Sequence, residues 1–181
     1  MRLGSFVRID MEGSKFTQKT LDIFYSLHDK HPGVGIVLQA ALRRTEADAK
    51  DAVARKVRVR LCKGAYKESA AVAFPDKKDV DANYDRCSAI LSKAPVPAMA
   101  THDDARIEAA LKSFDAAGLV KSEYELQMLY GIRAKRAKEL RAKGHTVRIY
   151  VPYGTHWFPY FYRRIRERRE NLLFVARNFF E

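Results

Sequence analysis

The chain has 181 residues, 47% of them hydrophobic, which is enough for one domain with a buried core. Its formal net charge of +12 is compatible with binding to nucleic acid or to an acidic membrane surface. However, acidic residues alternate with many of the basic residues, a pattern typical of solvated helix faces. The two cysteines are far apart in the sequence, which argues against a zinc site or a disulfide scaffold. The sequence has no apolar run of ~18 residues and no signal-peptide pattern, so we expect a cytoplasmic protein.

Strand and helix patterns alternate along the chain. Short apolar runs predict six strands, at residues 5–11, 33–40, 57–63, 96–101, 123–129 and 146–152. Helical patterns follow them at 15–31, 45–56, near 80–92, up to about 117, at 133–143 and from about 157. Thr45 with Asp48 resembles a capping box, and Gly118 and Gly144 end two helices. This alternation predicts βα units around a parallel sheet.

The positions of the polar residues distinguish two folds that share this alternation. A doubly wound open sheet concentrates function at one crevice, whereas a (β/α)₈ barrel draws its catalytic face from the ends of many strands. Polar residues occur in or just beyond the ends of six predicted strands: Asp10, Glu12, Gln39, Arg60, Lys63, Thr101, His102, Gln127 and Tyr150. This distribution favours the barrel.

The number of predicted strands falls short of a whole barrel. Six units of about thirty residues are present, and eight would need roughly 240 residues. We therefore expect an α/β fold, a TIM-like barrel truncated to about six βα units with the first two missing, in which residues 1–181 form a single, partial domain. The strands at 5–11 and 146–152 would then be exposed parallel edges, open to self-association or to pairing with another chain.

Five motifs occur in a characteristic order. They are VRIDMEGS (7–14), RLCKGAY (60–66), ATHD (100–103), YELQMLYGIR (124–133), and RIYVPYG (148–154) with YFYRRIRER (160–168). Together they resemble the proline dehydrogenase (proline oxidase) family, over the C-terminal three-quarters of its FAD-binding catalytic barrel. The resemblance implies oxidation of L-proline to Δ1-pyrroline-5-carboxylate, the first step of proline catabolism to glutamate. FAD would take the hydride at N5 and pass electrons to a quinone. Peripheral contact with the inner membrane is compatible with this activity, and no specific nucleic acid partner is expected.

The same resemblance implies a substrate pocket. The paired guanidinium groups of Arg163 and Arg164 would hold the proline carboxylate, and Glu167 would pair with them. Tyr150 would pack its ring against the proline ring. Tyr66 would be a second aromatic at the pocket, and Asp10 would belong to the polar network that orients the site. The catalytic and substrate-binding residues implied are Asp10, Tyr66, Tyr150, Arg163, Arg164 and Glu167.

The resemblance also implies a cofactor site, but it implies no metal site. The FAD contacts would be Gln39, Arg60, Lys63, Gly64, Lys77, Thr101, His102, Asp103 and Gln127. Arg60 would stabilise the negative charge that develops on the N1–C2=O edge of the flavin. Lys77 would contact the adenosine or pyrophosphate end. Asp103 stands where the family often has asparagine, and its charge would weaken this stabilisation unless it is paired or points away.

Two other interpretations remain open from the sequence. The chain could be a catalytically dead barrel remnant, because the missing units would normally supply a strand-end lysine. It could also be a basic nucleic-acid-binding module that uses the aromatic, arginine-rich residues 150–168, with steep salt dependence and no bound flavin. No nucleic-acid-binding motif is recognisable, and the polar residues converge on strand ends. The family interpretation is therefore preferred.

Overall fold

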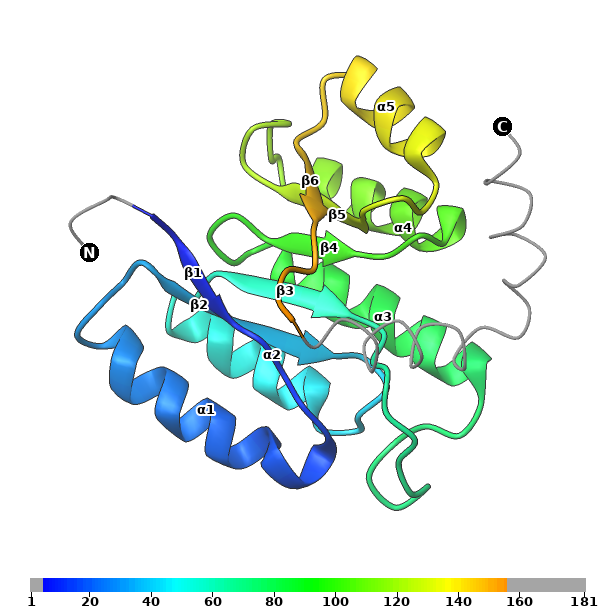
Figure 1. The fold of residues 1–181 in the computed structure, drawn as a ribbon. Helices are drawn as coiled ribbons and strands as arrows, with labels where there is room; N and C mark the ends of the chain where they lie inside the picture. The colour runs from blue at the N-terminus through cyan, green and yellow to red at the C-terminus, as the bar shows by residue number, and fades with distance from the viewer. Residues whose placement is uncertain (1–4, 156–181) are drawn as a thin grey trace. The chain divides into compact units, whose positions relative to one another are not determined.

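The computed structural model describes residues 5–155, which alternate between strands and helices (Figure 1). The strands are β1 (Val7–Ile9), β2 (Val34–Gln39), β3 (Val59–Cys62), β4 (Ala98–Ala100), β5 (Glu125–Leu129) and β6 (Val147–Tyr150). The helices are α1 (Ser14–His28), α2 (Thr45–Ala54), α3 (Lys77–Leu91), α4 (Asp104–Ala116) and α5 (Ala134–Ala142). The chain divides after Tyr150 into two units, and the whole of this sheet lies in the first unit.

The six strands form one parallel sheet in the order β1-β2-β3-β4-β5-β6. Each strand pairs with the strand that follows it in the chain, and a helix makes each crossover. Figure 1 shows the helices along the outer face of this curled sheet. The predicted order of strands and helices is therefore confirmed, and β1 and β6 are the edges of the described sheet.

The two faces of the sheet differ sharply in character, because successive strand side chains point to opposite sides. The outer face carries Ile36, Leu61, Met99 and other apolar side chains that are almost completely buried against the helices. Arg60 and Glu125 each pair in register with Ala98, so their side chains share the inner face. TIM barrels usually fill this interior with branched apolar side chains. Here the same face also carries the charged side chains of Arg60 and Glu125, which makes it a candidate for a functional site.

The predicted start of α2 at Thr45 is confirmed, but its predicted capping is wrong. Thr45 does not form a capping box with Asp48, since its hydroxyl donates to the Gln39 carbonyl oxygen at 2.5 Å. Asp48 instead accepts from Arg44, the residue at the N-cap of α2. The third helix starts at Lys77, three residues before the predicted start, and Asp76 is its N-cap in an extended conformation.

The predicted glycine ends of α4 and α5 are confirmed. Gly118 and Gly144 adopt φ values of +73° and +87°, in the left-handed region that favours glycine. The helix predicted from about residue 157 lies outside the described residues.

Gly35 in β2 leaves room for a neighbouring aromatic ring. A Cβ atom at Gly35 would overlap Cζ of Phe6 and lie 2.6 Å from the Arg58 backbone oxygen. The ring can turn, but the carbonyl belongs to the β2–β3 pairing, since it accepts from Ile36 N. We expect Gly35→Ala to lower the free energy of unfolding by about 1–3 kcal/mol.

Urea unfolding followed by circular dichroism would measure this effect. Gly13→Ala is the matched control, because the nearest atom to an added Cβ at Gly13 is 3.4 Å away. Equal stability of Gly35→Ala and the unsubstituted protein would contradict the close packing of Phe6 on β2.

Candidate active site

Arg60 in β3 contacts two other predicted site residues on the inner face of the sheet, one next to β1 and one in β6. Its Nη2 donates to Asp10 Oδ1 at 2.5 Å, and its guanidinium carbon lies 5.5 Å from the centre of the Tyr150 ring. Asp10 directly follows β1, Arg60 lies in β3 and Tyr150 ends β6. The side chain of Arg60 is only 14% exposed, whereas that of Asp10 is 53% exposed. The structure thus brings three of the predicted site residues together from strands distant in sequence.

The turn after β1 is attached to β2 and to the β3–α3 loop. Gln39 Nε2 donates to the Glu12 backbone oxygen at 2.8 Å, and the Tyr66 hydroxyl donates to the Glu12 carboxylate. In the same loop, Glu68 accepts from Ser14 N at 2.7 Å and from Ser14 Oγ at 2.5 Å. Glu68 therefore caps α1 from 54 residues away. These bonds connect Tyr66, predicted to contact substrate, through Glu12 to Gln39, predicted to contact the cofactor.

Gly64 follows β3 and adopts φ +111°, a conformation that favours glycine. A Cβ at this position would lie 3.1 Å from Ala41 Cβ and 3.3 Å from Gln39 Oε1. The backbone after β3 therefore runs close to the predicted cofactor residue Gln39, and a side chain at position 64 would separate them.

A second charged cluster lies at the starts of α3 and α4. Lys63 Nζ is 2.5 Å from Asp81 and 2.8 Å from Asp103, and Lys77 Nζ is 2.5 Å from Asp81. Arg106 approaches Asp81 to 3.3 Å. Burial alone would raise the pKa of both Asp81 and Asp103, but hydrogen bonds and charges from Lys63, with the charge of Lys77, lower each pKa below its ordinary value. Asp81 was not predicted, and its i,i+4 spacing from Lys77 is the only sequence signal for it.

Asp103, where the family often has asparagine, is paired. Besides Lys63, it accepts a hydrogen bond from Ala105 N at 3.1 Å and so caps α4. The predicted cofactor residues Lys63, Lys77 and Asp103 are brought into one cluster, and the Asp103 charge is compensated within it.

His102 connects the ends of β4 and β5. Leu129 N donates to His102 Nε2 at 2.9 Å, and Arg133 Nη1 donates to the His102 carbonyl oxygen at 2.6 Å. Thr101 accepts from Asp103 N at 3.2 Å, so both predicted residues shape the turn that leads into α4. Gln127 lies in the middle of β5 and donates to the buried Glu125 at 2.7 Å.

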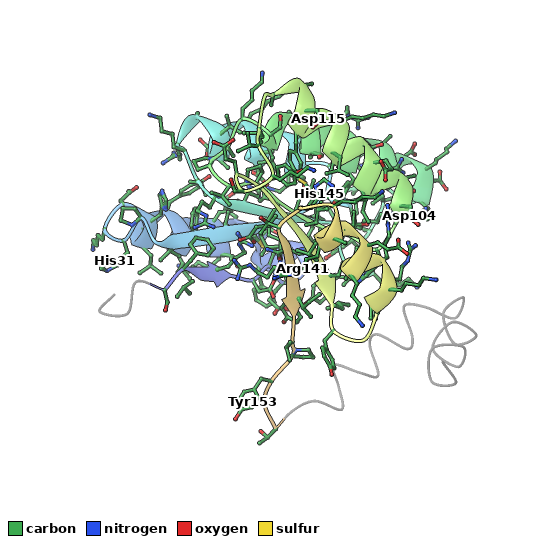
Figure 2. All side chains as sticks on the ribbon, turned by 90° about the horizontal axis from the view of Figure 1, so that it is seen from above. His31, Asp104, Asp115, Arg141, His145 and Tyr153 are labelled. Atoms are coloured by element: carbon green, nitrogen blue, oxygen red, sulfur yellow. The ribbon has the colours of Figure 1, made fainter. Side chains whose placement is uncertain are left out.

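The beginning of α4 is also tied to α5. Asp104 lies 2.6 Å from Arg133 and 2.8 Å from Arg136, at the opposite end of α4 from Asp115 (Figure 2). Hydrogen bonding to Arg133 is the main cause of the lowered pKa of Asp104. These pairs hold the fourth and fifth units together next to the predicted site.

Three of the predicted site residues lie outside the described residues. Arg163, Arg164 and Glu167 lie outside the described residues, so their roles stay predictions. Within residues 5–155, no group of three or more His, Cys, Asp or Glu side chains could hold a metal ion. Across the same residues, no helix is both long enough and apolar enough to span a membrane.

Asp81→Asn tests the charged cluster. The substitution removes the carboxylate that faces Lys63, Lys77 and Arg106 but preserves the side-chain volume. We expect the free energy of unfolding to fall by about 2 kcal/mol, because Lys63 and Lys77 lose charge-assisted contacts to a nearly buried carboxylate, while Lys63 keeps Asp103. Chemical unfolding at pH 7 would measure this, and Glu46→Gln, in an exposed pair with Lys50, should change it far less. Equal effects of the two substitutions would contradict the cluster's role in stability.

Comparison with known proteins supports the family resemblance. The family model for proline dehydrogenase matches residues 1–177. Proline dehydrogenase 2 of Bacillus subtilis (strain 168) is 44% identical over 170 residues, which are 93% of this chain and 56% of that protein. Proline dehydrogenase of Deinococcus radiodurans is 42% identical over 176 residues, 96% of this chain and 57% of that protein. The chain spans a little over half the length of these relatives.

Two solved structures share the fold. Proline utilization A (PutA) from Bdellovibrio bacteriovorus, inactivated by N-propargylglycine, superposes with a TM-score of 0.82 at 30% identity, over 88% of this chain and 19% of that one. A mutant PutA from Bradyrhizobium japonicum gives a TM-score of 0.76 at 28% identity, over 90% and 19%. These matches confirm the predicted TIM-like barrel fold class. With the family model over nearly its whole length, this chain belongs to the proline dehydrogenase family.

Proposed function

We propose that residues 1–181 form a partial FAD-binding catalytic domain that oxidises L-proline to Δ1-pyrroline-5-carboxylate. The observation that carries this proposal is the meeting of Arg60, Asp10 and Tyr150 on the inner face of the barrel. The three residues come from three strands, and their side chains offer a cation, an acid and an aromatic wall. Such a combination suits a flavin and a small ring compound that carries a carboxylate.

The described residues fit a flavin. Arg60 Nε is buried and has no hydrogen-bond partner among the described residues, so a donor is available there. Next to it, Gly64 lets the backbone approach Gln39 closely. Lys77 is 74% exposed at the edge of the charged cluster, where it could turn toward a diphosphate. The proposed cofactor contacts are Gln39, Arg60, Lys63, Gly64, Lys77, Thr101, His102, Asp103 and Gln127.

FAD, when bound, supplies the acceptor for the hydride that leaves proline Cδ. The contribution of the chain is to hold the substrate and set the local charge. In this proposal Tyr150 and Tyr66 form apolar walls for the ring, and Arg163 with Arg164, supported by Glu167, binds the carboxylate. Asp10 orients Arg60 through the hydrogen bond between them. In this proposal the side chains contribute to catalysis mainly by holding the substrate in the reactive position and orientation.

We further propose that a quinone receives the electrons and that the protein contacts the inner membrane peripherally. The net charge of +12 would favour an acidic lipid surface. The alternative of a nucleic-acid-binding module is not favoured, because the family match covers residues 1–177 and the candidate site lies inside a barrel.

Visible absorption of the purified chain supplied with FAD tests the proposal. We expect a flavin band that stays with the protein through gel filtration and bleaches when L-proline is added without oxygen. D-proline is the control, since inversion at Cα moves the carboxylate away from its binding groups. Folded protein without a bound flavin band would contradict cofactor binding. A bound band that L-proline leaves unbleached would contradict the oxidation.

A further inference from the structure

The loop between β3 and α3, residues 63–76, carries Tyr66, which the proposed function places beside the proline ring. The second half of this loop is fixed to the segment that follows β2. Arg43 N donates to the Val72 carbonyl oxygen at 3.0 Å, and Arg43 Nε donates to the Ala70 carbonyl oxygen, also at 3.0 Å. Tyr66 lies in the first half, so its position depends on other contacts.

Two side-chain contacts fix the first half of the loop to the start of α1. The Tyr66 hydroxyl donates to the Glu12 carboxylate. Glu68 accepts from Ser14 N at 2.7 Å and from Ser14 Oγ at 2.5 Å, so that both of its carboxylate oxygens are used. Lys67, which lies between Tyr66 and Glu68, is exposed. The loop is therefore held on this side through the side chains of Tyr66 and Glu68.

The start of α1 is well suited to hold a carboxylate from another loop. Its N-cap is Gly13, which has no side chain to offer, and its first turn contains no acidic residue. The unpaired N–H groups and the positive end of the helix dipole therefore favour an anionic acceptor at this position. A Cβ atom at Gly13 would lie 3.4 Å from Glu68 Oε1 and 4.0 Å from Tyr66 Cγ, so the loop packs directly against the N-cap.

The contact of Glu68 is the stronger of the two. Glu12 is exposed and Tyr66 is 38% exposed, so water can compete for the hydrogen bond between them. Glu68 is half-buried and makes two hydrogen bonds to a single residue, one of them to a main-chain N–H of the helix. A charged acceptor with two donors forms a stronger contact than a single exposed hydroxyl does.

We propose that Glu68 is a positioning residue for the substrate pocket, which fixes the ring of Tyr66 by holding the loop on the start of α1. Glu68 follows Tyr66 by two residues, so a fixed Glu68 restricts where the tyrosine ring can lie. A pocket wall that is ordered before the substrate arrives loses less conformational freedom on binding. The role in substrate binding rests on the proposed function, whereas the contact between Glu68 and α1 does not.

Chymotrypsin cleavage of the chain without added cofactor gives the first test. Removing a helix cap favours local opening, so Glu68→Ala should speed cleavage after Tyr66 by about 5–20-fold. Tyr130, whose side chain is 73% exposed, provides an internal reference, and cleavage after it should change by no more than about twofold. Unchanged cleavage after Tyr66, or equal acceleration at both tyrosines, would overturn the proposal.

Glu68→Gln is the matched variant. Its amide oxygen can still accept from Ser14 N, and its amide N–H can donate to Ser14 Oγ, so the loop keeps its contact without the charge. Cleavage after Tyr66 in this variant should stay within about threefold of the unsubstituted rate. Cleavage as fast as in Glu68→Ala would contradict hydrogen bonding as the way in which Glu68 holds the loop.

Reduction of the bound flavin by L-proline without oxygen gives the second test. In the FAD-loaded protein, Glu68→Ala should raise the proline concentration that gives half the maximal rate by about 5–10-fold. The maximal rate should stay within about twofold, because the loss is one of binding. Glu68→Gln should restore most of the affinity. A purely structural role for Glu68 would lower Tm without this separation of affinity from rate.

The two tests distinguish failure of this inference from failure of the proposed function. Faster cleavage after Tyr66 with unchanged affinity for proline would overturn the role of Glu68 in substrate binding. An unsubstituted chain that binds no flavin would contradict the proposed function, and cleavage after Tyr66 would then decide by itself whether Glu68 holds the loop.

Discussion

Glu125→Gln is expected to lower the free energy of unfolding by about 3–5 kcal/mol, the largest stability effect we predict for a single substitution. Glutamine has nearly the same volume as glutamate, so the loss does not come from a cavity. It comes from the arginines, since Arg148 loses two charge-assisted hydrogen bonds and Arg8 and Arg58 lose their nearby negative charge. Chemical unfolding at pH 7 measures the difference, with Glu46→Gln as an exposed control.

The pH dependence of this effect has a definite sign. Burial alone would raise the pKa of Glu125, but hydrogen bonds from Arg148 and Gln127 and the charges of Arg148 and Arg8 lower it below 4.5. A carboxyl group whose pKa is lower in the folded state than in the unfolded state stabilises the fold at pH values above its unfolded-state pKa. This stabilisation is lost as the pH falls through the folded-state pKa. The difference between wild type and Glu125→Gln should therefore shrink below about pH 4.5. A difference that persists at low pH would contradict the ionic origin of the effect.

Arg60→Met is expected to slow reduction of the bound flavin by L-proline about 100-fold, if the proposed function holds. Methionine keeps most of the side-chain length but removes both the charge next to the flavin edge and the hydrogen bond to Asp10. Because Asp10 is half exposed, its loss of a partner should have little effect on folding. Stopped-flow absorbance without oxygen measures the rate, and Tm checks that the variant is folded.

Arg60→Lys separates the charge of this residue from its shape. Lysine keeps the positive charge but cannot offer the planar set of donors, so its rate should lie between those of wild type and Arg60→Met. Asp10→Asn, which keeps the charge of Arg60 but weakens its anchor, should have a smaller effect than Arg60→Met. If Arg60→Met is folded and binds flavin but its flavin is reduced by L-proline at an unchanged rate, the proposed role of Arg60 is contradicted.

The arrangement of strands and helices was predictable from sequence because it depends on local signals. Short apolar runs and helical periodicity give the order of the elements, and glycine gives the ends of α4 and α5. The capping at the start of α2 was not predictable in this way. Thr45 has the local chemistry of a cap, but its hydroxyl is used by the carbonyl at the end of β2, a contact that exists only once the chain has folded.

The candidate site was predictable in residue type and strand position but not in its pairings. The sequence places Arg60, Asp10 and Tyr150 at separate strands, and only the curvature of the sheet brings them into contact. Glu68 and Glu125 had no local signal for their main contacts, because Ser14 and Arg148 lie 54 and 23 residues away. The resemblance to proline dehydrogenases supplied the roles, which no periodicity could have indicated.

The neighbour-to-neighbour strand order also bears on how the chain reaches this structure. Every strand of the described sheet pairs with the strand adjacent to it in sequence, so no pairing has to wait for a distant segment. Such a topology keeps the loops that must close short and lowers the entropic barrier to each addition. A ribosome releases residues in the same direction, at about 5–20 per second. The sheet can therefore grow one unit at a time during translation, with its newest strand as the docking edge for the next.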